Sequence, residues 1–182
     1  ADAYLSTDSG VLTVNGSIDV LALGVSSDAY LDTGSLDLKN ADINVTTITS
    51  SLDVGYFASA RFSSDSKITG SMDTIQVVAY GEDSNAQLEL TNNSNDLSIN
   101  GDISVWAAGL SSDAGVEIDG DIAFNNTNIV VSADGFSSYA SLEMDKGYLT
   151  GSIDNISVSA NGEDSYAKLD LQDGSNDLTI NG

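Results

Sequence analysis

Carboxylates recur at one kind of position along this chain, beside short stretches of Ala, Gly and Ser. One pair follows AYG at 79–81, another follows ANG at 160–162, and single Asp residues close VSSD (25–28) and LSSD (110–113). The acids at these positions are Glu82, Asp83, Glu163, Asp164, Asp28 and Asp113. Because the chain has neither Cys nor His, any bound metal must be a hard cation held by oxygen. These carboxylates are therefore candidate calcium ligands, and the alternative is a solvated acidic edge.

The same residues do not indicate catalytic chemistry. Polysaccharide-processing β-helix enzymes use paired carboxylates with a cation or calcium. Carboxylate pairs such as Asp119 and Asp121 are expected from composition alone, because the chain has 28 Asp and Glu residues. The Lys and Arg residues are scattered rather than convergent: Lys39, Arg61, Lys67, Lys146 and Lys168. We expect a protein that is not an enzyme.

The charge balance restricts the partners. Five Lys and Arg residues oppose 28 acids, which gives a net charge of −23. We expect no nucleic-acid partner, because phosphate binding needs clustered cations. Apolar residues make up 41% of the chain and are regularly spaced, unlike those of a solvated acidic tail. No apolar run approaches the ~18 residues of a membrane helix, so we expect a folded chain without a membrane span.

Repeated elements position the acids. One Ala marks each unit, with gaps of 26 to 29 residues and a period of about 27. The markers are Ala3, Ala29, Ala58, Ala86, Ala114, Ala140 and Ala167. Residues 68–101 also align without gaps to residues 149–182, which indicates duplication of a three-unit block. We expect residues 1–182 to form a single repeat domain of about six and a half coils.

Period-two alternation within each unit predicts short strands and no helix. Every second residue is apolar after the marker, as in AQLEL (86–90), and again in the I-x-V-x-A-x-G run that begins at Ile103. A third short run, such as LSI at 97–99, lies between them and is often followed by Asn-Gly. The pattern is that of an all-β protein.

Two all-β architectures fit these strands. In a parallel β-helix-like solenoid, each unit is one coil of about 27 residues and inward apolar residues form ladders. In an antiparallel meander or β-sandwich, each Asn-Gly marks a hairpin. A two-residue hairpin at Asn100 and Gly101 would place Ile99 on one face and Ile103 on the other, which splits the core. Parity, the alternation of inward and outward side chains, therefore favours the solenoid. A three-residue loop with a bulge would also keep both residues in one core, so the hairpin stays as the alternative.

The stretches of Ala, Gly and Ser, such as AAGLSSDA (107–114), are predicted to be corners of the coils. Small inward Ala residues leave little volume to fill, Gly permits a positive φ, and Ser bonds backbone groups that the corner leaves unpaired. The absence of Pro agrees, because interior strands need every N–H.

Several aromatic residues are predicted on the outer surface. Trp106 points outward, and the pairs Tyr4 with Tyr30 and Tyr139 with Tyr166 occupy equivalent outward positions in successive coils. The rings are interpreted as a stabilising surface ladder or as a sugar-binding platform.

The alternating strands, small-residue corners, Asn-Gly punctuation and acidic, Cys-free composition resemble the repeat regions of bacterial surface and secreted proteins. Examples are filamentous-haemagglutinin-like adhesins and other extracellular β-solenoid fibre proteins. The resemblance covers essentially the whole chain. It implies an extracellular or cell-surface protein, acting as an adhesin stalk or as a surface or biofilm-matrix fibre.

Two functions follow as expectations. One is a non-catalytic structural repeat protein, and the other is a carbohydrate-binding or carbohydrate-processing β-helix domain with a glycan or cell-surface partner. The last residues, NDLTING at 176–182, match NDLSING at 95–101, after which the earlier copy continues into another strand. We therefore expect unpaired strand edges and end-to-end self-association into filaments.

Overall fold

A computed structural model of the chain describes residues 1–49, 56–64, 67–145, 147–172 and 177–181. The elements in this part of the chain are all strands: β1 (Asp2–Val14), β2 (Ser17–Gly24), β3 (Ser27–Thr49), β4 (Phe57–Ser64), β5 (Ile68–Tyr80), β6 (Asp83–Ile99), β7 (Ile103–Ala108), β8 (Ser111–Asp134), β9 (Ser137–Asp145), β10 (Leu149–Asn161), β11 (Asp164–Leu171) and β12 (Asp177–Ile180). The described residues contain no helix that could cross a membrane.

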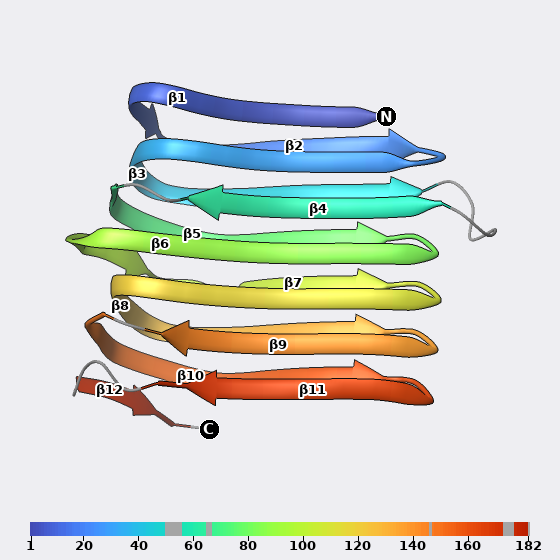
Figure 1. Cartoon of the computed structure of the whole chain (residues 1–182). Coiled ribbons are helices and arrows are strands. Elements are labelled where there is room, and N and C mark those ends of the chain that lie inside the picture. Colours follow the sequence, from blue (N-terminus) through green and yellow to red (C-terminus); the bar gives the residue numbers. More distant parts are fainter. Residues whose placement is uncertain (50–55, 65–66, 146, 173–176, 182) are drawn as a thin grey trace.

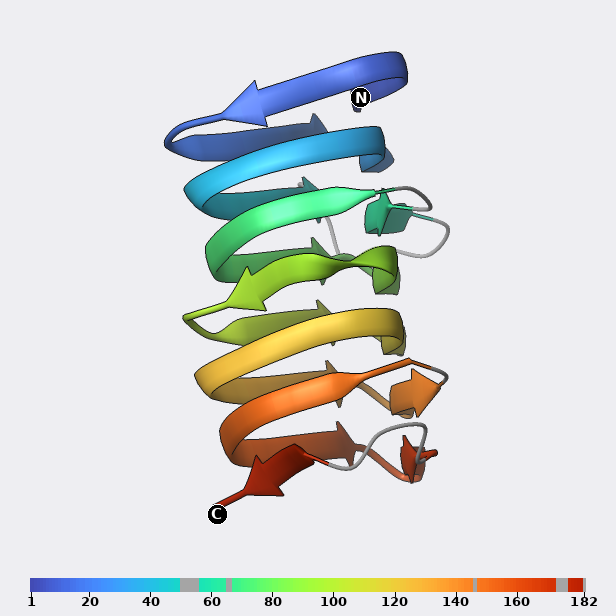
Figure 2. The ribbon, with the colours of Figure 1, turned by 90° about the vertical axis from the view of Figure 1, so that its left-hand side faces the viewer.

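Each strand pairs in parallel with residues about one coil away along the chain. Ala86 pairs with Ala114, and Val105 pairs with Val131. The described strands join into one 12-stranded sheet. Figures 1 and 2 show the result, a stack of coils with similar outlines along one axis. The predicted β-solenoid with coils of about 27 residues is confirmed.

The antiparallel alternative is wrong, and the Asn-Gly at 100 and 101 shows why. The Asn100 N–H donates to the carbonyl oxygen of Met72 in the preceding coil at 2.8 Å, so the chain does not fold back on itself. Ile99 and Ile103 are both fully buried. The corner therefore keeps the apolar residues before and after it in one core, as the parity argument requires.

Each coil has two long sides and one short side. The marker face, nearer the viewer in Figure 1, consists of β1, the first part of β3, β4, β6, the first part of β8, β9 and β11. The opposite face consists of β2, the last part of β3, the last part of β5, β7, and the last parts of β8 and β10. Shorter segments, such as 97–99 and 122–124, connect the two faces.

Ladders of identical or similar side chains fill the space between the faces. Ile43, Ile75, Ile103 and Ile129 stand in register on four successive coils, and each is fully buried. Full burial of such a side chain is worth about 1.5–3 kcal/mol. Repetition of this contribution in every coil makes the apolar interior the main source of stability.

The marker alanines form a second inward ladder, with one correction. Ala29 pairs with Ala60, and Ala60 pairs with Ala86. Ala58, the marker expected from the sequence, pairs instead with Ser27 and a second Ser one coil on. Ala58 and Ala60 are both buried and share the same parity, so side-chain size and alternation do not distinguish them.

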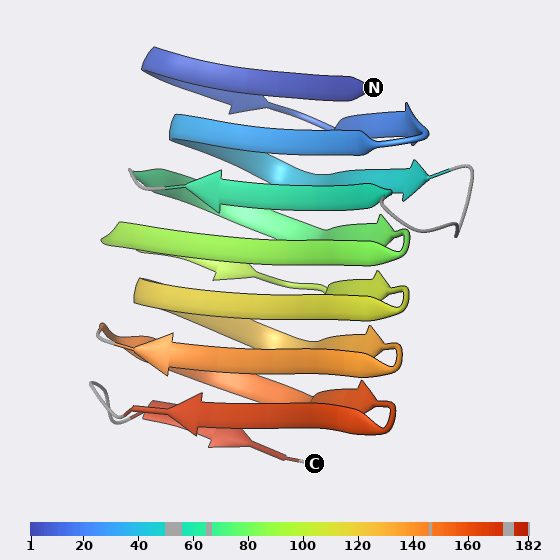
Figure 3. The same ribbon diagram turned by 45° about the vertical axis from the view of Figure 1, so that its right-hand side comes forward.

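The corner from the opposite face to the marker face, brought forward in Figure 3, requires glycine for a steric reason. A Cβ on Gly109 would lie 1.6 Å from the carbonyl oxygen of Gly81, and a Cβ on Gly135 would lie 2.0 Å from that of Gly109. Neither Gly109 nor Gly135 has a positive φ. The expectation of a positive φ is therefore wrong for Gly109 and Gly135, where close approach of successive backbones excludes a side chain, whereas the equivalent Gly162 has a φ of 158°.

Serines line the inside of the same corner. The Ser138 hydroxyl donates to the carbonyl oxygen of Gly135 at 3.0 Å, and the Ser112 hydroxyl donates to that of Asp134 at 2.8 Å. In three other coils of the described part, the hydroxyl oxygens of Ser27, Ser84 and Ser165 are buried and have no hydrogen-bond partner. The predicted bonding of corner backbone by Ser is thus confirmed for some coils.

Candidate functional site

The two acidic dipeptides predicted as calcium ligands lie at the same corner but three coils apart. The register runs from Asp83 through Ser111 and Ser137 to Asp164. At ~4.8 Å per coil, Asp83 and Asp164 are separated by about 14 Å. Calcium holds its oxygen ligands at ~2.3–2.6 Å, so these two positions cannot share one ion.

Asp28 and Asp113 are also three coils apart. Their row passes from Asp28 through Ser59 and Asn85 to Asp113. Glu82 is only 8% exposed, whereas Glu163 is exposed. Within the described residues, no group of three or more acids is placed to hold a metal. The structure does not bring either pair of equivalent acids together, although Asp113 lies on the coil next to Asp83, two residues further along the strand.

Carboxylates do stack on neighbouring coils in a different row of the marker face, which we call the acid row. It consists of Glu89, Glu117, Glu143 and Asp170. Sequence reasoning missed this row, although its signal is the acid at the fourth position of AQLEL, AGVEI, ASLEM and AKLDL. Strand spacing places neighbouring members about 4.8 Å apart at the backbone.

Two of the scattered cations lie against the acid row. Arg61 pairs with Glu89 at 2.5 Å, and Lys168 contacts Glu143 at 2.7 Å and Asp170 at 3.3 Å. Hydrogen bonds first to Glu143 and then to Asp170 raise the pKa of Lys168. Among the described residues no cation pairs with Glu117. Lys146 lies outside the described residues.

Two aspartates outside the acid row differ in their electrostatic surroundings. Burial raises the pKa of Asp113. Hydrogen bonds from Asn161 at 2.6 Å and from the Trp106 indole at 3.0 Å lower the pKa of Asp134. Burial therefore destabilises the ionised form of Asp113, whereas the two hydrogen-bond donors stabilise the ionised form of Asp134.

The predicted tyrosine pairs are confirmed. The rings of Tyr4 and Tyr30 are 5.0 Å apart and tilted, and those of Tyr139 and Tyr166 are stacked at 5.6 Å. Stacking between coils turns the ring faces of Tyr139 and Tyr166 toward each other, as in a stabilising ladder. Trp106 has a partner that the sequence did not indicate, because it lies 6.1 Å from Tyr80 on the neighbouring coil.

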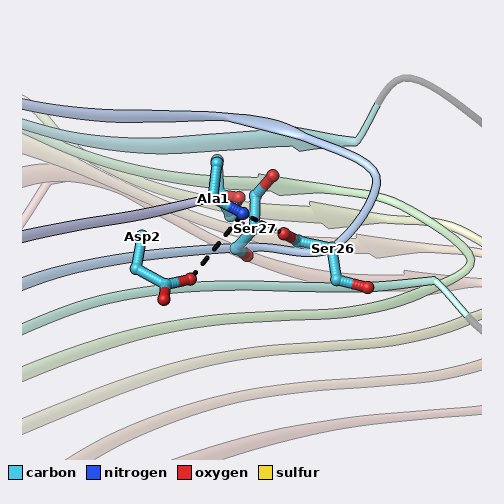
Figure 4. A network of polar contacts seen from close by, with 5 residues as sticks. Ala1, Asp2, Ser26 and Ser27 are labelled. Carbon is cyan, nitrogen blue, oxygen red and sulfur yellow. Dashed lines mark hydrogen bonds and ion pairs between the residues drawn. The ribbon is translucent and has the colours of Figure 1, made fainter.

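The corner at Ser26 also holds the α-amino group (Figure 4). The nitrogen of Ala1 donates to the carbonyl oxygen of Ser26 at 2.5 Å and lies 3.8 Å from an Asp2 carboxylate oxygen. The Asp2 ion pair is solvent-exposed, so its contribution to stability is small.

A shallow hollow of about 340 Å³ opens beside the corner. Its lining consists of Tyr80, Glu82, Ala108, Gly109, Leu110 and Phe136. The lining is mostly apolar and contains one carboxylate. The hollow thus offers a mainly apolar contact surface beside the Glu82 carboxylate.

Comparison of the chain with protein-family models, curated proteins and solved structures found no match. The function must therefore be argued from the solenoid, its stacked rows and its surfaces.

Proposed function

We propose that this protein is a non-catalytic, extracellular structural repeat protein, a rod that serves as an adhesin stalk or as a subunit of a surface or matrix fibre. The observation that carries the proposal is the continuous parallel register. Each marker strand from β1 to β11 is in register with the next one, with inward ladders that continue from coil to coil.

This register makes the molecule quasi-one-dimensional. The backbone hydrogen bonds between coils run along the rod, and each coil adds about 4.8 Å of length. The pairing geometry is the same in every coil. The end coil of one copy can therefore pair with the end coil of another copy just as neighbouring coils pair within one chain. End-to-end association into filaments is the form of assembly that this geometry supports.

The test combines sedimentation over a concentration series with negative-stain microscopy. We expect an open series of rods whose mean length grows with concentration. Chains that stay single at all concentrations would contradict end-to-end assembly. Turnover assays on polysaccharides are expected to show no product, and hydrolysis or elimination would contradict the non-catalytic role.

A carbohydrate-binding role is the second candidate, and the Tyr80 and Trp106 pair favours it. Aromatic rings held side by side on an outer face are suited to stacking against sugar rings. A glycan array separates the two candidates. Selective binding of one glycan class that is lost in Trp106→Ala would favour the second, whereas a structural rod shows no selective binding.

A further inference from the structure

The opposite face differs from the rest of the molecule in charge. Three of its outward rows, starting at Asp19, Leu21 and Leu23 on β2, cross all six strands, and a fourth row at its edge, starting at Ser17, contains Asp42 on β3. Asp19 and Asp134 are the only charged residues in the three rows that cross all six strands. In a chain with a net charge of −23, this face is almost neutral, and we call it the neutral face.

An apolar stripe covers four adjacent strands of the neutral face. Its members on β2, β3, β5 and β7 are Leu21, Leu23, Ile48, Val78, Tyr80 and Trp106. Leu21 is 54% exposed, Leu23 is 57% exposed and Ile48 is 41% exposed. Outward leucines at neighbouring register positions form a continuous apolar surface rather than the isolated exposed residues usual in soluble proteins.

The charge distribution identifies the partner. A cationic partner would be drawn to the marker face, because the acid row lies there. Two copies of this polyanion repel each other wherever carboxylates would meet, and apposed neutral faces avoid that repulsion. Flat sheets can pack face to face at about 10 Å, with outward side chains interdigitated.

We propose that the neutral face pairs with the same face of a second copy of this chain, forming a two-fold dimer. A two-fold axis that lies in the interface, parallel to the strands and between β3 and β5, lays β2 of each copy against β7 of the other and superimposes the two apolar stripes. Such a contact is closed, so it gives dimers rather than an open series. The inference goes beyond the fibre role and does not depend on it.

The size of the contact face sets the expected strength. Four strands at ~4.8 Å and the eight residues of β2 at ~3.3 Å give a face of about 19 by 26 Å, and the stripe is its apolar part. The corresponding ~1,000 Å² for both copies lies at the lower end of specific interfaces, so the dimer should dissociate in the micromolar range. Added NaCl should strengthen it, because salt screens the repulsion between the two polyanions.

The test compares two substitutions that add the same charge in the same coil. Leu23→Glu places a carboxylate in the stripe, whereas Val11→Glu places one at a residue that is 67% exposed outside the neutral face. Sedimentation equilibrium should show a dimer dissociation constant raised about 100-fold or more by Leu23→Glu and changed by less than about 3-fold by Val11→Glu. Circular dichroism should show the same fold for both, because both positions are exposed.

Fluorescence distinguishes face pairing from end-to-end growth. Trp106 is the only Trp in the chain and lies in the stripe. Dimerisation should shift its emission to the blue and protect it from acrylamide as protein concentration rises, whereas end-to-end contacts leave it unchanged. Four results would each overturn the proposal: a monomeric wild type, a dimer that survives Leu23→Glu, equal effects of both substitutions, or Trp106 protection that follows added glycan rather than protein concentration.

Discussion

Asp113 and Asp134 carry the same carboxyl group in different surroundings, and we expect opposite effects when each is replaced by Asn. At pH 7, Asp113→Asn should raise the melting temperature, because it removes a charge that burial disfavours. Asp134→Asn should destabilise the protein by about 1 kcal/mol, since Asn offers only one acceptor oxygen to Asn161 and Trp106. For a chain of this size that corresponds to a fall of about 2–4 °C. Thermal denaturation measures both.

The two substitutions control for each other, because each removes one negative charge from the whole molecule. Their pH dependence also has a defined sign. The pKa of Asp134 is lowered, so its stabilising contribution exists above the unfolded pKa and is lost as pH falls through the folded pKa. The pKa of Asp113 is raised, so protonation as pH falls through the folded pKa favours the native state. The difference in melting temperature between each variant and wild type should therefore shrink in acid. If both substitutions shifted the melting temperature in the same direction at pH 7, the assigned surroundings of Asp113 and Asp134 would be contradicted.

The site was less predictable from the sequence than the strands were. Recurrence identified Glu82 and Glu163 as equivalent, and they do share a corner, but two apolar residues, Leu110 and Phe136, stand between them. Equivalence along a repeat indicates the same row, not adjacent coils. Two acids meet only when consecutive units carry an acid at the same position. For the acid row this can be seen in the sequence, because the consecutive runs AQLEL, AGVEI, ASLEM and AKLDL all have an acid at their fourth residue.

At the scale of the coil, the corner glycines make a distinct prediction. Gly109→Ala should destabilise the protein by about 3 kcal/mol or more, because its Cβ would overlap a backbone carbonyl that cannot move independently of the stacked coil. Gly115→Ala is the matched control within a strand. There the Cβ would meet only the Gln87 amide, the far end of a flexible side chain, so a change within about 1 kcal/mol is expected. Chemical denaturation gives both values, and a Gly109→Ala protein as stable as wild type would refute close coil packing.

The architecture of the coil followed from alternation and parity. Ile99 and Ile103 had to share one core, and that condition selected the solenoid over the hairpin. The start of the third unit did not follow, because Ala58 and Ala60 both satisfy size and parity and only the pairing with Ala29 separates them. The steric role of Gly109 was also hidden, because it depends on a backbone from another coil.

For the whole molecule, a net charge of −23 on a rod of stacked coils creates repulsion along every acidic row. Neighbouring positions in the acid row are closer than the ~10 Å screening length at 0.1 M salt, so moderate salt relieves only part of this repulsion. Raising NaCl from about 10 mM to about 500 mM should therefore increase the melting temperature progressively, by about 5 °C.

Calcium tests whether any of this stabilisation is specific. A calcium ion takes 6–8 oxygen ligands, whereas the acid row offers one carboxylate per coil and three of its members already contact Arg61 or Lys168. We therefore expect CaCl2 and MgCl2 at equal ionic strength to raise the melting temperature equally, as screening ions. A saturable rise with CaCl2 that MgCl2 does not reproduce would contradict this and show a calcium site. Glu117→Gln would then locate it: loss of the rise places the ion in the acid row, and retention places it elsewhere, with Glu82 and Asp83 at the corner as the next positions to replace.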